Sequence, residues 1–571
     1  MNPTIKERIE FWKSSIFDDA TKQEILKLES EPEENLIDAF YKDLEFGTGG
    51  MRGIMGAGTN RINKYTLGRA TQGLSMYLKQ QFSKDDQIAV AIAFDCRHNS
   101  KQFGKLVADV FSANGIKVYL FEDLRPTPEL SFAVRHLHCK AGIVLTASHN
   151  PPEYNGYKVY WNDGGQLVPP HDKKVIELVK STNYEDVDFV AQPELIEEVG
   201  AEVDLAYIEG CVNQTYIKGD KSDLKIVFTS LHGTSIRAIP AAFEKAGYSD
   251  FHIVQDQAEP NGDFPTVQSP NPEEPEALKM AIDEAQTVNA DLVIGTDPDG
   301  DRLGVGVLTK KGKIELLNGN QTVALLTWYL IRSLKHNGKL KPNHFVAQTV
   351  VTSELPAKIA EGFGVKTYYC LTGFKWIADI IRRKEGSEVF IGGGEESYGY
   401  MVGDFVRDKD ATSASLIFAE LALEAKRNGK TVLDVLSEIY REYGFYRERL
   451  ISVVKKGKSG ADEIAKMMED FRRSTPEEVN GSKVIKTIDI QLGVETDLRN
   501  GKRNKIDLPA SNVFQIFTED GSKITARPSG TEPKIKFYIS VHDKWDDGAN
   551  YEAVYKKLEH RIDAIIADMK L

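Results

Sequence analysis

The chain has 571 residues, of which 41% are hydrophobic and 27% charged, so its composition is globular and excludes a largely disordered protein. The length is too great for one hydrophobic core and suggests roughly four domains. A formal net charge of −13 argues against a broad basic face, so no nucleic-acid partner is expected, and an anionic ligand would need positive charge concentrated in a small site.

The N-terminal segment is predicted to be a helix rather than a targeting sequence. Thr4 and Glu7 have the spacing of a capping box, and apolar residues recur at helical intervals at Ile5, Ile9, Trp12 and Ile16. Its charges interrupt any apolar run of a signal peptide, and no stretch reaches the roughly 18 apolar residues of a membrane span. The four cysteines form no C-x-x-C pair. We therefore expect a cytoplasmic protein with no membrane partner.

Strands and helices alternate along most of the chain. Strand-like apolar runs occur at IAVAIAF, AGIVLT, LKIVFTS, DLVIGT, FVAQTVV and EVFIGG, and amphipathic helices such as SELPAKIAEGF lie between several of them. This order predicts α/β domains with largely parallel sheets. After about residue 445 the strands and helices cluster, which predicts a smaller α+β domain. We place the domains at residues 1–205, 206–318, 319–444 and 445–571.

The first of four polar loops follows AGIVL and reads TASHNPPEYNGYK. Ligands in α/β sheets bind beyond the carboxyl ends of strands, so such loops are where chemistry is expected. Ser148 is the candidate nucleophile and would need a nearby base or metal to activate it. His149 and Lys158 are at hand for proton transfer or phosphate contact. Taken alone, ordinary turn chemistry is the commoner explanation of such a sequence.

The second loop, GTDPDGDR, follows DLVI and contains Asp297, Asp299 and Asp301. Three like charges this close repel each other unless a cation binds, and carboxylate oxygens favour a hard ion such as Mg²⁺. An EF-hand fails because Arg302 and Leu308 stand where that loop needs glycine and glutamate. A D-x-D-x-T phosphatase loop fails because Asp301 occupies the threonine position. A solvated acidic turn is the alternative.

The third and fourth loops carry groups suited to a sugar phosphate. In GGGEESYGY the glycines let the backbone approach a ligand, and Glu395 and Ser397 could bind vicinal sugar hydroxyls, although a plain flexible turn would look similar. In ARPSGTEPK an anion nest suited to a phosphate is predicted from four residues: Arg527, Ser529, Gly530 and Thr531.

The loops occur together over nearly the whole chain, in the order FGTGGMRG, TASHNP, DPDGDR, GEESYG and RPSGTEPK. With these motifs the chain resembles the α-D-phosphohexomutases, the phosphoglucomutase/phosphomannomutase superfamily. GEESYG and VRDKDA look more like phosphoglucomutases than phosphomannomutases. The length and the helical N-terminus are similar to the longer branch, which includes phosphopentomutase-type and sugar-bisphosphate-synthase members.

The resemblance implies four domains around a central cleft, three of them α/β with mixed, largely parallel sheets and the C-terminal one α+β. It implies that Ser148 carries the transferable phosphoryl group and helps to hold one Mg²⁺ with Asp297, Asp299 and Asp301. Further roles carry over to the positions that match the family motifs. Proton transfer would fall to Lys158, His149 or Lys409, the reacting centre would be faced by Arg52 and Arg302, and the sugar or its phosphate would be contacted by Thr372 and Gly373.

The activity that the resemblance implies is the reversible interconversion of glucose 1-phosphate and glucose 6-phosphate. It would pass through a phosphoserine and glucose 1,6-bisphosphate, which also serves as activator. Phosphomannomutase, phosphopentomutase and hexose-bisphosphate synthase activities stay open, as does a monomeric or homodimeric state. An ATP-dependent sugar kinase is disfavoured because no G-x-x-x-x-G-K-[ST] loop is present. An inactive phosphosugar-binding protein is disfavoured because Ser148 and the aspartates are intact.

Overall fold

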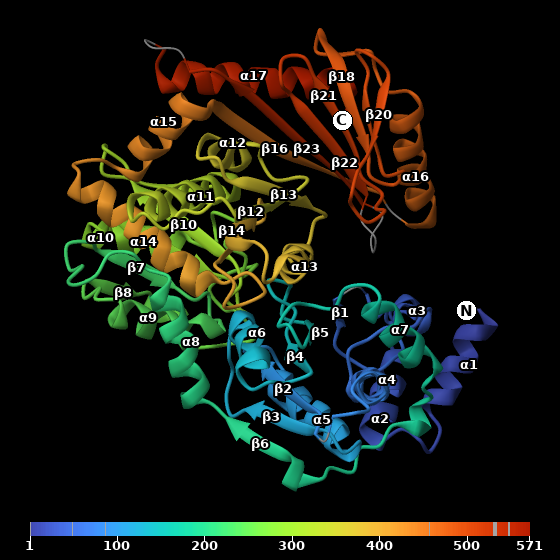
Figure 1. Ribbon diagram of the computed structural model, residues 1–571. Helices are drawn as coiled ribbons and strands as arrows, with labels where there is room; N and C mark the ends of the chain where they lie inside the picture. Colours follow the sequence, from blue (N-terminus) through green and yellow to red (C-terminus); the bar gives the residue numbers. More distant parts are fainter. Residues whose placement is uncertain (1, 48, 86, 456, 529–533, 546–548) are drawn as a thin grey trace. The chain divides into compact units, whose positions relative to one another are not determined.

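The computed structural model describes residues 2–47, 49–85, 87–455, 457–528, 534–545 and 549–571. The chain divides into two compact units. Unit one comprises Met1–Gly319 and Phe374–Gly429, and unit two comprises Asn320–Gly373 and Lys430–Leu571. Each unit is described by itself (Figure 1).

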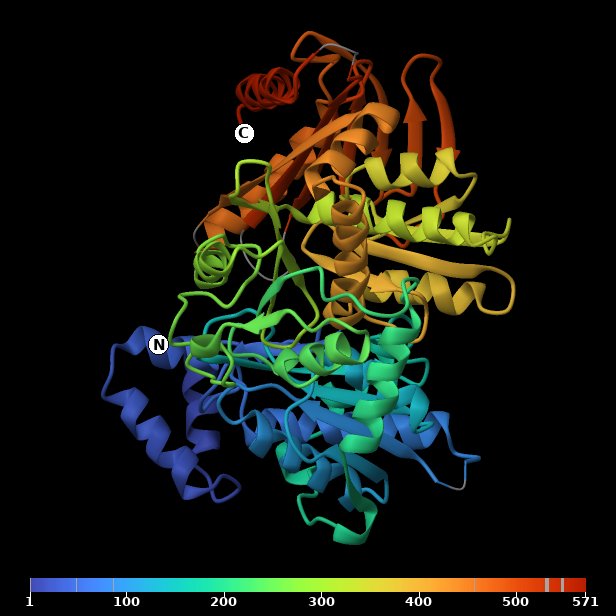
Figure 2. The same ribbon diagram turned by 90° about the vertical axis from the view of Figure 1, so that its left-hand side faces the viewer.

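Unit one begins with a group of three helices, which form the blue segment at the N-terminus in Figure 2: α1 (Pro3–Trp12), α2 (Asp19–Glu29) and α3 (Glu33–Phe40). They enclose a small core of their own around the fully buried Trp12. The predicted capping box at Thr4 is wrong, because the helix begins at Pro3, two residues before the start that a cap at Thr4 would give. Asn2 is the N-cap and its side chain accepts a hydrogen bond from the backbone N–H of Thr4, while Pro3 occupies the first helical position, where no N–H is needed.

The first sheet of unit one has the strand order β1-β5-β4-β2-β3-β6. The β4-β2-β3-β6 pairs are parallel, and β5 is antiparallel to both β4 and β1, so the sheet is mixed. The strands are β1 (Gly50–Ile54), β2 (Ala89–Phe94), β3 (Lys117–Phe121), β4 (Ala141–Leu145), β5 (Tyr154–Trp161) and β6 (Ile196–Val199). The helices are α4 (Lys64–Gln81), α5 (Ser100–Ala113), α6 (Thr127–His136), α7 (His171–Ser181) and α8 (Ala201–Asn213).

Helices cover both faces of this sheet, which explains why β2 is apolar along its whole length. Val90 and Ile92 pack into a core with α4, α5 and α7, whereas Ala91 and Ala93 pack into a second core with α6. Because successive side chains of a strand point to opposite faces, the continuous run AVAIAF serves two cores at once.

The second sheet of unit one has the order β11-β10-β9-β7-β8, with β9, β7 and β8 parallel and β10 and β11 antiparallel to their neighbours. Its strands are β7 (Ile226–Thr229), β8 (Phe251–Ile253), β9 (Leu292–Thr296), β10 (Leu303–Leu308) and β11 (Ile314–Leu317). Its helices are α9 (Ile239–Lys245) and α10 (Lys279–Val288). Unit one also contains α13 (Lys375–Lys384), the hairpin β14 (Val389–Glu395) and β15 (Gly399–Val402), and α14 (Ala411–Arg427), which packs against β9 and β10.

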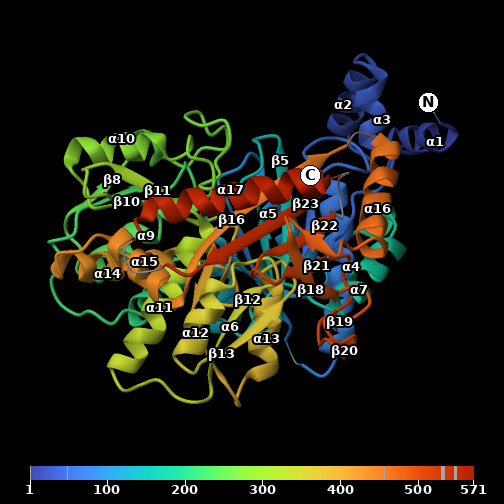
Figure 3. The ribbon, with the colours of Figure 1, turned by 90° about the horizontal axis from the view of Figure 1, so that it is seen from above.

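Unit two contains the remaining elements. Its first part has α11 (Gly319–His336), the parallel pair β12 (His344–Thr349) and β13 (Lys366–Cys370), α12 (Leu355–Gly362) and α15 (Val432–Tyr443). A long antiparallel sheet follows, in the order β16-β23-β22-β21-β18-β19-β20. Two helices pack against it: α16, next to β22 and β23, and α17, next to β16 and β23 (Figure 3).

The bounds of this last domain agree with the α+β expectation. Its strands are β16 (Phe445–Val454), β17 (Glu478–Val479), β18 (Ser482–Asp489), β19 (Val494–Asp497), β20 (Lys502–Lys505), β21 (Phe514–Thr518), β22 (Lys523–Pro528) and β23 (Lys534–Asp543). Its helices are α16 (Gly457–Arg473) and α17 (Tyr551–Met569). The predicted α/β character of the chain is confirmed, while the four domain boundaries stay a prediction. Among the described helices, none has both the length and the apolar character that crossing a membrane requires.

Candidate active site

The first two predicted loops meet within unit one. The loop with Ser148 follows the carboxyl end of β4, and the aspartate loop follows the carboxyl end of β9. Although 149 residues separate them in sequence, Ser148 Oγ donates a hydrogen bond to Asp297 Oδ2 at 2.7 Å. Two strand ends from two different sheets therefore bring the candidate nucleophile to the candidate metal loop.

Ser148 is buried, with 3% of its surface exposed, and its backbone adopts the left-handed conformation with φ of 53°. Its N–H donates to Thr146 Oγ1 at 2.8 Å, which fixes the start of the turn. His149 Nδ1 lies 3.3 Å from Ser148 Oγ. Burial lowers the pKa of His149 to about 2, and Arg302 and Arg52 add to this effect, so the imidazole is neutral.

The three aspartates form a buried cluster whose carboxylate oxygens lie within 4.8 Å of one another. The loop is bent around the first of them, because Asp297 Oδ1 accepts the N–H groups of Asp301 and Arg302 at 3.1 and 3.0 Å. Asp299 and Asp301 each have one buried oxygen, Oδ1, without a hydrogen-bond partner. Buried carboxylate oxygens are almost always paired, so these orphan atoms fit a set of donors for a hard divalent cation.

Two lysines supply positive charge at the other side of the cluster. Lys158 Nζ lies 2.6 Å from Asp299 Oδ2 and 3.3 Å from Asp301 Oδ2. Lys409 Nζ lies 3.1 Å from Asp301 Oδ2 and 3.2 Å from Asp408 Oδ1. Burial by itself would lower the pKa of both ammonium groups, but the surrounding carboxylates outweigh it and raise the pKa of each.

The aspartates respond differently to this environment. Burial, reinforced by the charges of Asp301 and Asp299, raises the pKa of Asp297 well above its usual value. Burial also opposes ionisation of Asp299, but the Lys158 ammonium outweighs it and holds the pKa of Asp299 below its usual value. The pKa values of two neighbouring carboxyl groups in one loop are therefore shifted in opposite directions, as is common in reactive sites.

The two predicted arginines also lie in unit one. Arg302 Nη1 donates to Glu273 Oε1, and Arg302 Nε lies 3.9 Å from Asp297 Oδ2. Arg52 lies on β1, and its Nη1 donates to Asn150 Oδ1 at 2.9 Å, two residues beyond Ser148. Both guanidinium groups therefore adjoin the Ser148 and aspartate loops.

The loop with Glu395 and Ser397 is tied to the aspartate loop through backbone contacts. The N–H of Leu303 donates to Tyr398 O at 2.9 Å, and Arg302 and Gly399 form an isolated β-bridge. Lys409 crosses directly over Gly399, where an added Cβ would lie 2.1 Å from Lys409 Cδ. Only glycine leaves room for that lysine. Glu395 ends β14 and is 7% exposed.

The remaining predicted site residues belong to unit two. Thr372 and the positive-φ Gly373 follow β13 and are half-buried. Arg527 is half-buried near the end of β22. Ser529, Gly530 and Thr531 lie outside the described residues. These residues keep their predicted roles as hypotheses.

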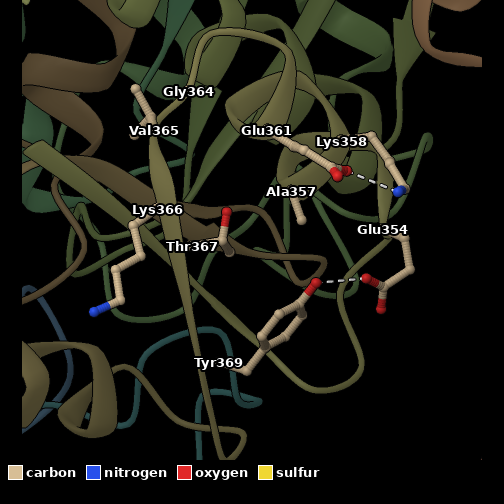
Figure 4. Close-up of a pocket in the computed structure, with 9 residues that line it drawn as sticks. All are labelled: Glu354, Ala357, Lys358, Glu361, Gly364, Val365, Lys366, Thr367 and Tyr369. Atoms are coloured by element: carbon tan, nitrogen blue, oxygen red, sulfur yellow. Dashed lines mark hydrogen bonds and ion pairs between the residues drawn. The ribbon is translucent and has the colours of Figure 1, made fainter. Parts of the chain in front are cut away.

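Unit two also has an open hollow of about 500 Å³ between α12 and β13 (Figure 4). Four of its polar side chains are paired with one another. Tyr369 OH donates to Glu354 Oε2 at 2.6 Å, and Lys358 Nζ donates to Glu361 Oε2 at 2.8 Å. None of the described residues predicted for the site lines this hollow, so we do not assign the chemistry to it.

Three residues that shape the site were missed in the sequence. Thr127 Oγ1 donates to Asp299 Oδ2 at 2.7 Å, and Thr234 N donates to Pro298 O at 2.8 Å. Glu273 is the partner of Arg302. Thr127 follows β3 in LRPTPEL and Thr234 follows β7 in LHGTS, so the rule that polar loops after strands build sites would have found both.

The chain matches three sequence families in succession. They are described as phosphoglucomutase/phosphomannomutase alpha/beta/alpha domain I over residues 43–186, domain II over residues 205–311 and domain III over residues 318–443. Together with the C-terminal sheet domain, these matches confirm the expected architecture of three α/β domains followed by one α+β domain.

Curated relatives cover nearly the whole chain. A protein named phosphoglucomutase from Staphylococcus epidermidis is 39% identical over 527 residues, covering 89% of this chain and 95% of the relative. One from Staphylococcus haemolyticus is 39% identical over 508 residues, covering 88% and 91%.

Solved structures share the fold at lower identity. The phosphoglucomutase pp63/parafusin from Paramecium gives a TM-score of 0.66 at 17% identity, covering 92% of this chain and 96% of the other. A phosphoglucomutase/phosphomannomutase family protein from Burkholderia thailandensis gives 0.65 at 19% identity, covering 92% and 97%. The joined loops, the three domain families and the relatives together show that this chain belongs to the phosphoglucomutase/phosphomannomutase family of intramolecular phosphotransferases.

Proposed function

We propose that the protein is a Mg²⁺-dependent phosphoglucomutase that interconverts glucose 1-phosphate and glucose 6-phosphate, with glucose 1,6-bisphosphate as intermediate and activator. The activity follows that of relatives named phosphoglucomutase at 38–39% identity. The observation that carries the mechanism is the 2.7 Å hydrogen bond from Ser148 Oγ to Asp297 Oδ2, within a buried cluster of three carboxylates.

Ser148 is the group that would be phosphorylated. In the first transfer the bond from Ser148 Oγ to phosphorus breaks, and a bond forms from the free hydroxyl oxygen of the sugar monophosphate to phosphorus. The proton that the hydroxyl loses is balanced by one gained at Ser148 Oγ as it leaves, and we assign this relay to Lys158, which would donate a proton to Oγ and take one from the hydroxyl, with His149 and Lys409 as neighbouring alternatives. The resulting bisphosphate reorients, and its other phosphoryl group returns to Ser148.

Charge on the transferring group must be offset, because phosphoryl transfer depends on positioning and electrostatic stabilisation. Ser148, Asp297, Asp299 and Asp301 would hold Mg²⁺, which supplies positive charge beside the phosphoryl group when it is bound. Arg302 and Arg52 adjoin the same loops and are assigned to the reacting phosphate. Arg527 and the following Ser529-Gly530-Thr531 segment, together with Thr372 and Gly373, are assigned to the phosphate or sugar that is not reacting.

The nucleophile is tested by the Ser148→Ala variant. We expect it to lose mutase activity but to fold, because the substitution removes a single hydroxyl whose hydrogen bond goes to Asp297 Oδ2 in the site. Intact mass after incubation with glucose 1,6-bisphosphate should show one added phosphoryl group in the wild type and none in Ser148→Ala. Ser75→Ala is the matched control, since this buried hydroxyl only bonds Thr71 O within α4, at 2.8 Å. A phosphoryl group found on another residue would refute the assignment.

The sugar is tested by comparing kcat/KM for glucose, mannose, galactose and pentose 1-phosphates. We assign Glu395 and Ser397 to the 3- and 4-hydroxyls. Mannose shares both with glucose, since it differs at C2, whereas galactose differs from glucose at C4. Losing a hydrogen bond to a buried charged group costs about 1.5–3 kcal/mol, or more than tenfold in kcat/KM. Mannose 1-phosphate should therefore be a poor substrate and galactose 1-phosphate nearly none, whereas equal use of both would refute the role.

A cytoplasmic location completes the proposal. The four cysteines are free, and Cys139, Cys211 and Cys370 are buried, as suits a reducing compartment.

A further inference from the structure

The guanidinium of Arg97 lies inside the turn that carries Ser148. Its side chain is fully buried in the loop after β2. Nη2 donates to Ser148 O at 2.6 Å and also to Asn150 O. Nη1 donates to Pro151 O at 2.7 Å and to Tyr154 O at 3.1 Å. Four carbonyl groups of one turn therefore converge on a single planar cation.

Arg97 is itself held from several sides. Asp95 Oδ2 lies 3.3 Å from Arg97 Nε, and Asp95 Oδ1 accepts hydrogen bonds from Arg97 N at 2.9 Å and from Ser100 Oγ at 2.8 Å. Asn155 Nδ2 donates to Ser100 Oγ at 2.9 Å, which closes the network onto β5. The ring of Phe264, in the domain that carries the aspartate loop, lies 5.1 Å from the guanidinium carbon.

The turn needs this support because Ser148 is strained. With φ of 53° it lies in the left-handed region, which costs a residue with a side chain about 1 kcal/mol or more. The same turn aims Oγ at Asp297 Oδ2, 2.7 Å away. Such a conformation persists only where the surroundings over-determine it, and here the surroundings include the carbonyl contacts of Arg97 as well as the hydrogen bond from Ser148 N to Thr146 Oγ1.

We propose that Arg97 is a positioning residue for phosphoryl transfer: it holds the main chain of residues 148–154 so that Ser148 Oγ stays aimed at the aspartate cluster. This inference rests on the proposed function. Arg97 acts through the Ser148 backbone. Lysine cannot replace it, because an ammonium is a point charge and lacks the planar fork that reaches several carbonyls at once.

The test compares Arg97→Lys with Arg69→Lys. Arg69 is a matched control in the same domain, since its Nε donates to Val179 O at 3.1 Å and Thr182 O at 2.7 Å, at the end of α7. For Arg97→Lys we expect kcat to fall about a hundredfold, because a displacement near 1 Å has that effect, with KM within about threefold of wild type. Single-turnover phosphorylation of Ser148 by glucose 1,6-bisphosphate, followed by intact mass, should slow by the same factor. Arg69→Lys should lower the transition temperature but leave both rates within about threefold.

A purely structural role for Arg97 would show as equal kcat values in the two variants, or as a change confined to KM, and either result overturns the inference. If Arg97→Lys yields no folded protein, the Phe264→Leu variant tests the positioning role of Arg97 instead. It uncovers one face of the guanidinium and should lower kcat about five- to tenfold at unchanged KM, and an unchanged kcat would overturn the inference. Absence of Ser148 phosphorylation in the wild type would instead overturn the proposed function, so the two failures are distinct.

Discussion

Replacing Lys158 by methionine should expose how much of the charge in the aspartate cluster is balanced by protein groups. The side chain of Lys158 is 12% exposed, and its Nζ lies 2.6 Å from Asp299 Oδ2, where both carboxylate and ammonium are withdrawn from water. Removing one partner of a buried pair typically costs about 3–5 kcal/mol. We expect the lower end, about 3 kcal/mol, because Asp301 keeps Lys409 as a partner at 3.1 Å and Asp299 keeps the hydroxyl of Thr127.

Thermal unfolding with and without Mg²⁺ measures this effect. Without metal the variant should melt roughly 2–4 °C below wild type, and Mg²⁺ should raise its transition temperature more than that of wild type, since the ion no longer competes with an ammonium group. Lys221→Met is the matched control. Lys221 Nζ lies 3.2 Å from Glu420 Oε1 in a buried pair outside the site, so this variant should be destabilised without any extra gain from Mg²⁺. Equal gains in both variants, or no destabilisation of Lys158→Met in the absence of metal, would refute the reasoning.

Two further predictions concern unit two. Arg527→Ala should lower kcat/KM for glucose 1-phosphate and glucose 6-phosphate by similar factors, roughly tenfold to a few hundredfold, because the phosphate that it would hold is present in both orientations. Steady-state kinetics in the two directions checks this, and damage to one direction alone would contradict a shared phosphate site. Burial raises the pKa of Glu448 to about 7 from a usual value of 4.5, although Arg447 and Lys523 oppose the rise. The folded state therefore binds this proton more tightly, and up to about 3 kcal/mol of stability is lost as the pH rises from 4.5 through 7. Denaturant unfolding at pH 5 and 8 should show this loss in wild type and a much smaller one in Glu448→Gln.

The parts of the site that could be predicted from sequence are those made by adjacent residues. The three aspartates occupy alternate positions of one loop after an apolar strand. Both their proximity and the repulsion between their charges can therefore be inferred from one short stretch of sequence. The residues of the Ser148 turn are likewise adjacent in sequence and follow an apolar strand. That these two loops meet depends on how two separate sheets pack, and no short stretch of sequence carries that information.

The rule about polar loops after strands points to Thr127 as a site residue, but the group that Thr127 contacts could not be predicted, for the same reason. Thr127 reaches Asp299 across 172 residues of chain, and its sequence context is only a helix start after a strand. The N-terminal cap shows the limit of local rules as well. Asn2 and Thr4 are both good capping residues, and the intervening Pro3 decides between them by fitting the first helical position. A proline is thus more informative there than the preferences of either neighbour.

The charges of the site indicate how its ligands should bind. In the structure the three aspartates are met by three cationic side chains, Lys158, Lys409 and Arg302, although Lys409 is shared with Asp408 and Arg302 with Glu273. A phosphoryl group on Ser148 adds about −1.5 to −2 charges, and a divalent cation adds a similar positive charge. These opposite charges attract each other strongly in a buried site, where water screens them little. Phosphorylation of Ser148 and metal binding should therefore favour each other, and by thermodynamic linkage each must strengthen the other by the same factor.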